Sequence, residues 1–180
     1  LQHQGIVNRI GWMNAMYPLT PEDKVLQKTP YVFDVSVWEL LWSLWYGASI
    51  IFAKPEGHKD TNYLLELIAD KQISVMHFVP SMLDVFNQVL KVEVENKPRL
   101  LSSLTSLRYV FCSGEALHVN QVHAMHDLLP RVMLHNLYGP TEASVDVLYY
   151  DCTAKNLTDV YIGKPIWNTT AYILDNNLKV

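Results

Sequence analysis

Apolar residues recur along the chain in two alternating patterns. In some segments they are three and four residues apart, as at Leu64, Leu67 and Ile68, which is typical of a helix with one buried face. Other segments are short apolar runs such as "ISVMHFV", which are typical of buried strands. We expect helices over residues 8–17, 36–46, 62–71, 81–91 and 119–129. We expect strands over residues 24–30, 48–53, 73–79, 107–113, 131–138, 144–150 and 170–175.

This alternation of strands and helices predicts an α/β fold with a mostly parallel sheet flanked by helices. Ligands of such sheets bind at the carboxyl ends of the strands. Four expected strands run into polar or turn residues: before Asp34, at His77, at Ser113-Gly114-Glu115 and at Tyr138–Glu142. The pattern therefore places the candidate chemistry along one edge of the sheet.

The helix over residues 36–46 shows recognisable end signals. Ser36 and Glu39 have the spacing of a capping box, and Gly47 is expected to end the helix. Apolar residues cover most of its circumference, so we expect it to be buried. They are Val37, Leu40, Leu41, Leu44 and Trp45.

Composition and charge exclude several classes of protein. The chain has 180 residues, a length typical of one domain. Its net charge of -4 gives no sign of the basic surface that nucleic-acid binding requires. It contains no apolar run long enough for a membrane span. Cys112 and Cys152 lack metal-ligand spacing, which favours a reduced, cytoplasmic setting. Both ends look cut, and we expect residues 1–180 to be a fragment of one larger core domain.

The motif "NLYGPTE" suits nucleotide chemistry. Pro140 must end the strand, after which Thr141 offers a hydroxyl to a phosphate and Glu142 an oxygen ligand to Mg²⁺. Tyr138 offers a flat face to a base. A capped turn with surface side chains would look the same, and the spacing leaves both interpretations open.

Asp34 and His77 also have two interpretations each. Asp34 comes two residues before the expected cap Ser36, so its carboxylate either supports the helix end or faces a pocket that takes an ammonium group. His77 lies near the end of an apolar strand, where a satisfied core histidine is the usual explanation.

Three segments together carry a resemblance to a known family. "FDVSVWE", "NLYGPTE" and "IGKPIWNTTAYILD" resemble the adenylation domains of non-ribosomal peptide synthetases, in the acyl-activating, AMP-binding superfamily. The resemblance implies part of the large N-terminal subdomain of the adenylate-forming fold. It also implies that an amino acid and ATP form an aminoacyl adenylate, whose acyl group passes to phosphopantetheine on a carrier domain of the same synthetase.

The resemblance further implies a role for each matching residue. Asp34 would hold the substrate ammonium, and the catalytic pair Thr141 and Glu142 would contact a phosphate and Mg²⁺. The residues around the adenine would be Gly114, Glu115, Ala116, Asn136 and Tyr138. The amino-acid pocket would be lined by Asp34, Val35, Trp38, His77, Phe111, Ser113, Leu137, Val145 and Asp146, a set similar to the serine-selecting pattern.

Two rival functions stay open. An acyl-CoA ligase would use the same fold, although it would leave the Asp34 carboxylate without an amine partner. A non-catalytic remnant would keep the fold and bind nothing. The family's phosphate loop, ribose-binding aspartate and catalytic lysine do not occur in residues 1–180, so we expect the chain alone to have no useful activity.

Overall fold

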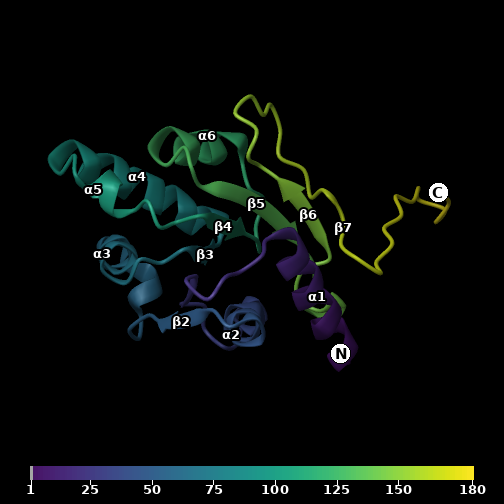
Figure 1. Cartoon of the computed structure of the whole chain (residues 1–180). Helices are drawn as coiled ribbons and strands as arrows, with labels where there is room; N and C mark the ends of the chain where they lie inside the picture. The colour runs from purple at the N-terminus through teal and green to yellow at the C-terminus, as the bar shows by residue number, and fades with distance from the viewer. Residues whose placement is uncertain (1) are drawn as a thin grey trace.

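The computed structural model describes residues 2–180, which form one seven-stranded sheet with helices on both faces (Figure 1). The strands are β1 (Lys24–Gln27), β2 (Ser49–Phe52), β3 (Val75–Phe78), β4 (Tyr109–Cys112), β5 (Met133–Tyr138), β6 (Leu148–Asp151) and β7 (Lys164–Pro165). The helices are α1 (His3–Met16), α2 (Val35–Tyr46), α3 (Thr61–Lys71), α4 (Pro80–Asn96), α5 (Leu100–Ser103) and α6 (Val119–Leu128), with 3₁₀ turns η1 (Gly57–Lys59) and η2 (Thr141–Ala143).

The strand order is β2-β1-β3-β4-β5-β6-β7. The pairs from β2 to β5 are parallel, whereas β6 and β7 join antiparallel. The predicted mostly parallel α/β sheet is therefore confirmed. Because β1, β3, β4 and β5 run the same way, their carboxyl ends lie along one edge, as the sequence indicated.

Two hydrophobic clusters lie on opposite faces of the sheet. Helices α1 and α2 cover one face, and α3, α4 and α6 cover the other (Figure 1). Successive strand residues alternate between them: Phe111 packs in the cluster of α1 and α2, and Cys112 in the cluster of α3, α4 and α6. This alternation decides which strand residues can share a pocket.

The expected capping box at α2 is wrong. Ser36 lies inside the helix, and no side chain caps its N-terminus. The Glu39 carboxylate instead accepts hydrogen bonds from the backbone N–H groups of Lys28 and Thr29, at 3.2 and 3.0 Å, and from the Thr29 hydroxyl at 2.7 Å. Glu39 thereby fixes the chain as it leaves β1. The helix ends as predicted, with Gly47 at a φ of 77°.

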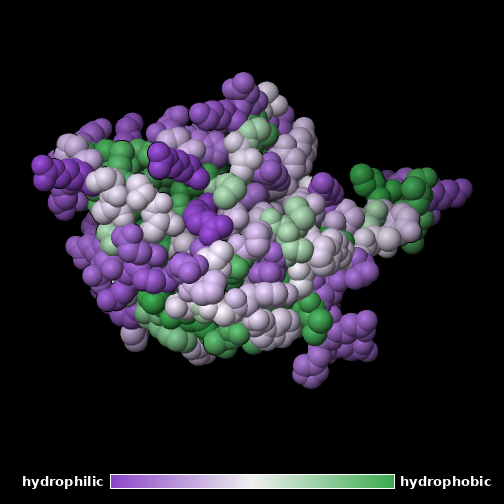
Figure 2. All heavy atoms as spheres, viewed as in Figure 1, coloured by the Kyte–Doolittle hydropathy of each residue, from purple (hydrophilic) through white to green (hydrophobic). Residues whose placement is uncertain are grey.

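The expected burial of α2 is also only partly right. Trp38 and Trp42 are buried, but Leu44 and Trp45 are exposed. The neighbouring β2 is an edge strand, and its Phe52 is exposed as well. Figure 2 shows the hydrophobic surface that results along the lower side of the molecule, over α2 and β2.

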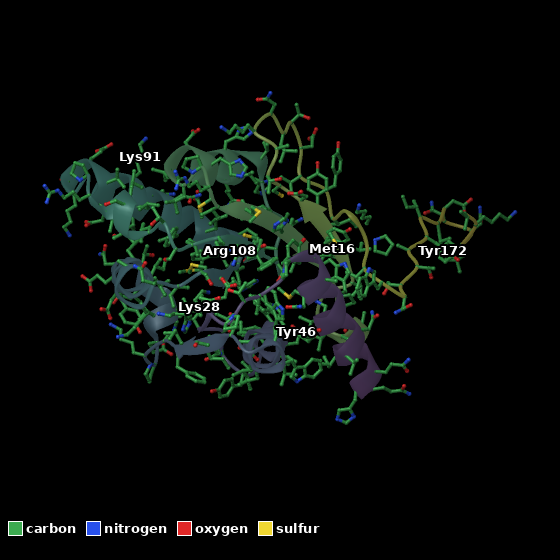
Figure 3. The ribbon with its side chains drawn as sticks, in the orientation of Figure 1. Met16, Lys28, Tyr46, Lys91, Arg108 and Tyr172 are labelled. Carbon is green, nitrogen blue, oxygen red and sulfur yellow. The ribbon has the colours of Figure 1, made fainter. Side chains whose placement is uncertain are left out.

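Several boundaries differ from the expectation. The helix predicted from residue 8 begins at His3, and β6 begins at Leu148 instead of residue 144. The strand predicted over residues 170–175 is wrong, because this segment pairs with no strand within residues 2–180. It runs away from the sheet, with Tyr172 well separated from the other labelled side chains (Figures 1 and 3). Within residues 2–180, no helix combines the length and the apolar character that a membrane crossing requires.

Candidate functional site

Asp34 stands directly before α2 at the carboxyl edge of the sheet. Its side chain makes no capping hydrogen bond to the helix. The Oδ2 atom is buried, and no group within residues 2–180 donates a hydrogen bond to it. A buried carboxylate oxygen without a hydrogen-bond donor destabilises the folded state. It is therefore expected only where a ligand supplies the donor. The cap interpretation of Asp34 therefore loses support, and the pocket interpretation gains it.

Four apolar members of the predicted amino-acid pocket pack together on the face covered by α1 and α2. They are Trp38, Phe111, Leu137 and Val145, all buried. The ring centroids of Trp38 and Phe111 are 5.5 Å apart, and Val35 packs against the same cluster. Residues from α2, β4, β5 and the loop before β6 thus converge on one place.

The predicted polar members lie on the same face. The His77 Nε2 atom is 2.9 Å from the Ser113 Oγ atom, and the His77 and Trp38 rings are 6.2 Å apart. Burial lowers the pKa of His77 well below its ordinary value, and the positive charges of Lys28 and Arg9 act in the same direction. The imidazole is therefore neutral near pH 7 and shares one hydrogen bond with the serine hydroxyl. The Trp38 Nε1 atom is buried without an acceptor among residues 2–180.

Asp146, the last predicted pocket residue, forms a buried ion pair that the sequence reading missed. The Arg9 Nη2 atom of α1 donates to the Asp146 Oδ2 atom at 2.9 Å, and both side chains are almost inaccessible. Burial raises the pKa of Asp146; Arg9 opposes this rise, and the charge of Asp34 adds to it. An arginine on the apolar stripe of Ile6, Ile10 and Met13 was the available signal.

The loop before β6 is bent so that Val145 and Asp146 reach this face. Ser144 and Val145 have φ values of 70° and 78°, a left-handed conformation that is rare for a β-branched residue. Such strain persists only where the surroundings enforce it. Here the loop packs against α1. The contact is so close that a Cβ added to Gly5 would stand 3.0 Å from the Ser144 Cβ.

A separate cavity of about 350 Å³ opens at the end of β5. It is lined by the predicted nucleotide residues Gly114, Glu115, Ala116, Asn136 and Tyr138, together with Leu137. Leu137 also belongs to the amino-acid cluster, so the two sites adjoin at this residue. The lining also includes Leu117, Gly139, Val160, Tyr161 and Ile162. No motif in the sequence pointed to Val160 or Tyr161.

Two polar contacts shape this cavity. The Asn136 Nδ2 atom donates to the Tyr161 carbonyl at 3.0 Å, which leaves the buried Oδ1 atom without a donor within residues 2–180. The Glu115 Oε2 atom accepts from the Ser81 backbone N–H at 3.1 Å, at the start of α4. The Glu115 carboxylate therefore anchors the start of α4 through one of its oxygens.

Thr141 and Glu142 lie in η2, where both side chains are exposed. They are not among the residues lining the cavity. Residues 2–180 contain no group of three or more histidine, cysteine, aspartate or glutamate side chains that could hold a metal. A lone carboxylate still suits Mg²⁺, which commonly takes one or two carboxylates together with substrate phosphates.

Comparisons with known proteins identify the family to which the chain belongs. The sequence model of the family described as AMP-binding enzyme matches residues 1–180. The chain is 48% identical over 184 residues to vanchrobactin synthetase VabF of Vibrio anguillarum, covering 99% of the chain and 6% of that protein. It is 45% identical over 175 residues to enterobactin synthase component F of Escherichia coli K12, covering 94% of the chain and 13% of that protein.

Solved structures show the same fold. The FmoA3 (S1046A) synthetase in its alpha-methyl-L-serine-AMP bound form matches with a TM-score of 0.87 and 25% identity, over 99% of this chain and 20% of that one. The adenylation domain AlmE of Vibrio cholerae, in complex with glycyl-adenosine-5'-phosphate, matches with a TM-score of 0.73 and 26% identity, over 92% of this chain and 30% of that one. The chain thus spans a small part of each relative. Since the family match extends over its whole length, the chain belongs to the AMP-binding enzyme family.

Proposed function

We propose that the chain supplies the amino-acid pocket and part of the ATP site of an adenylation domain in a non-ribosomal peptide synthetase. The observation that carries this proposal is the buried Asp34 Oδ2 atom, which has no donor within residues 2–180. An α-ammonium group would complete it, whereas a carboxylic acid without an amine would leave it unpaired. The synthetase names of the relatives support the same assignment.

The proposed substrate is L-serine. Bulky Trp38, Phe111 and Leu137 would admit only a small side chain, and His77, Ser113 and Asp146 would offer hydrogen bonds to its hydroxyl. A site built for a hydroxyl rejects alanine, because its buried polar groups would stay unpaired. The added methyl group of threonine would be rejected by volume.

ATP would occupy the cavity at the end of β5. The half-exposed Tyr138 ring would stack on the adenine, and the Asn136 Oδ1 atom would accept from its amino group. The Thr141 hydroxyl would donate to a phosphate oxygen at the turn that follows. Glu142 would hold Mg²⁺, which when bound would offset the negative charge of the phosphates.

The chain's own residues would act by positioning. Asp34 would fix the amino end of the substrate, so that its carboxylate meets the α-phosphorus in line with the leaving pyrophosphate. A substrate carboxylate oxygen would then form a bond to that phosphorus as the bond to the pyrophosphate oxygen breaks. In the next step, the thiol of a carrier-domain phosphopantetheine would take the acyl group and release AMP.

The test is amino-acid-dependent exchange of pyrophosphate into ATP by the longer protein that carries this chain. Exchange with serine and not with alanine is expected. Exchange with 3-hydroxypropionate, which lacks the amine, would support the acyl-CoA ligase instead. Failure to bind ATP in calorimetry would support the non-catalytic remnant.

A further inference from the structure

Arg9 is the one buried cation that contacts the predicted serine pocket among residues 2–180, and neither the motifs nor the comparisons give it a role. Its guanidinium carries five N–H donors but makes one bond within the described residues, to Asp146. The Nε and Nη1 atoms are buried and have no acceptor there. A side chain so incompletely satisfied is a poor choice for stability alone.

The contacts of α1 show that Arg9 is held in place. Its Cζ atom lies 5.1 Å from the centroid of the buried Trp12 ring, in a cation–π contact. One turn earlier, Gly5 lies against Ser144 of the loop that carries Asp146. Asn8 donates to the Trp167 carbonyl at 2.7 Å, which fixes the same helix from another side. The guanidinium is therefore a fixed charge and not a mobile surface group.

Charge balance indicates what this fixed cation does. The Asp34 Oδ2 atom and the Asp146 side chain are both buried, and the charge of Asp34 raises the pKa of Asp146. His77, a further titratable group of the predicted pocket, is neutral near pH 7. A substrate ammonium can neutralise only one of the two carboxylates. Without Arg9, the remaining carboxylate would either take a proton or attract a second cation.

We propose that Arg9 is a specificity-determining, positioning residue that neutralises Asp146, so that the pocket accepts a neutral hydroxyl side chain and rejects a cationic one. This inference rests on the proposed function, because it concerns the same pocket. The guanidinium of Arg9 favours the ionised form of Asp146, which would accept a hydrogen bond from the substrate hydroxyl. With Arg9 replaced by a neutral residue, the same carboxylate becomes a site for an ammonium group of similar size.

The discriminating substrate is L-2,3-diaminopropionate, in which an amino group replaces the hydroxyl of serine. Pyrophosphate exchange by the longer protein gives kcat/KM for both amino acids in the wild type and its variants. In Arg9→Met, the ratio of diaminopropionate to serine is expected to rise at least about tenfold, with KM for ATP unchanged. Arg9→Lys keeps the charge and is expected to keep the wild-type ratio.

The double variant Arg9→Met/Asp146→Asn removes both charges and is expected to return the ratio toward the wild-type value. The matched control is Arg108→Met, which breaks an ion pair with Asp23 of 2.8 Å at the opposite, amino-terminal edge of the sheet (Arg108 is labelled in Figure 3). This control is expected to leave the ratio unchanged. If Arg9→Met lowers kcat/KM for both amino acids by the same factor, Arg9 is only structural and the inference is overturned.

Two further measurements keep the inference open to refutation. Should Arg9→Met not fold, Asp146→Asn alone is expected to lower the ratio below the wild-type value, and a rise would overturn the inference. Infrared difference spectra between each protein and its Asp146→Asn counterpart report the protonation of Asp146 without any turnover. Arg9→Met is expected to shift its titration to higher pH than in the wild type, and identical titrations would overturn the proposal. If the wild type activates no amino acid, the proposed function fails, while these spectra still decide what Arg9 does.

Discussion

Gly139 and Val145 are in direct backbone contact. A Cβ placed on Gly139 would stand 2.5 Å from the Val145 carbonyl oxygen and 2.7 Å from the Cα of Asp146. Neither atom can move without displacing the loop that brings Val145 and Asp146 to the pocket. The glycine of the "YGPTE" turn thus serves the amino-acid pocket as well as the end of the strand.

Gly139→Ala is expected to destabilise the protein by about 1–3 kcal/mol, a typical effect of overpacking. Because the loop must shift, serine-dependent exchange should also fall more than tenfold. The matched control is Gly11→Ala in α1, where an added Cβ meets no atom within 4 Å. Replacing that helical glycine should stabilise the protein by about 0.5–1 kcal/mol. Urea unfolding and exchange assays on both variants check this, and an active Gly139→Ala of normal stability contradicts it.

Asp34→Asn keeps the shape of the side chain and removes its charge. If Asp34 holds the substrate ammonium, kcat/KM for serine should fall by a factor equivalent to about 2–5 kcal/mol. This is the range for losing one partner of a buried charged pair. KM for ATP should stay within about twofold, because the nucleotide cavity does not include this residue. Unchanged kcat/KM for serine would point instead to a substrate without an amine.

Tyr138→Ala should raise KM for ATP by the equivalent of about 1–3 kcal/mol, the range for stacking of a base on an aromatic ring. Tyr138→Phe is the matched control, since it keeps the ring and removes the hydroxyl. It should behave as the wild type in both ATP binding and exchange. Equal losses in the two variants would show that the hydroxyl matters and not the stacking.

His135 should make stability depend on pH. Burial lowers its pKa to about 4, although the nearby Asp151 carboxylate favours its charged form. An unfolded histidine takes up a proton below about pH 6.5, and the folded protein does not until about pH 4. The free energy of unfolding is therefore not reduced by this histidine above pH 6.5. Between pH 6.5 and pH 4 it falls by about 3 kcal/mol, because the unfolded state takes up the proton first. Urea unfolding of His135→Gln between pH 7 and 4 should show a shallower fall than the wild type, and equal slopes would refute the assignment.

Much of the fold was predictable because strand and helix periods differ. Runs such as residues 73–79 gave β3 nearly to its ends, and the motif after β5 indicated where the chemistry lies. The pocket residues of β3, β4 and β5 also obey the strand period: Phe111 and Ser113, two residues apart, face α1 and α2. Their roles stay predictions until the variants are assayed.

The predictions for α2 and the Arg9–Asp146 pair failed for physical reasons. The spacing of Ser36 and Glu39 fits a capping box, but it could not show that the end of β1 would offer Glu39 more donors. The apolar pattern of α2 could not show which residues a neighbour covers, because exposure depends on elements distant in sequence. Arg9 was missed for the same reason, since its partner lies 137 residues away.

The separation of 137 residues between Arg9 and Asp146 also affects how the chain folds during translation. The ribosome adds about 5–20 residues per second, so Asp146 follows Arg9 after roughly 7–30 seconds. During this interval α1 cannot bury its arginine against a counter-ion. Translation should therefore leave the first helix undocked until the last paired strands emerge, and slowing it would prolong the exposure of Trp12 and Met13 to chaperones.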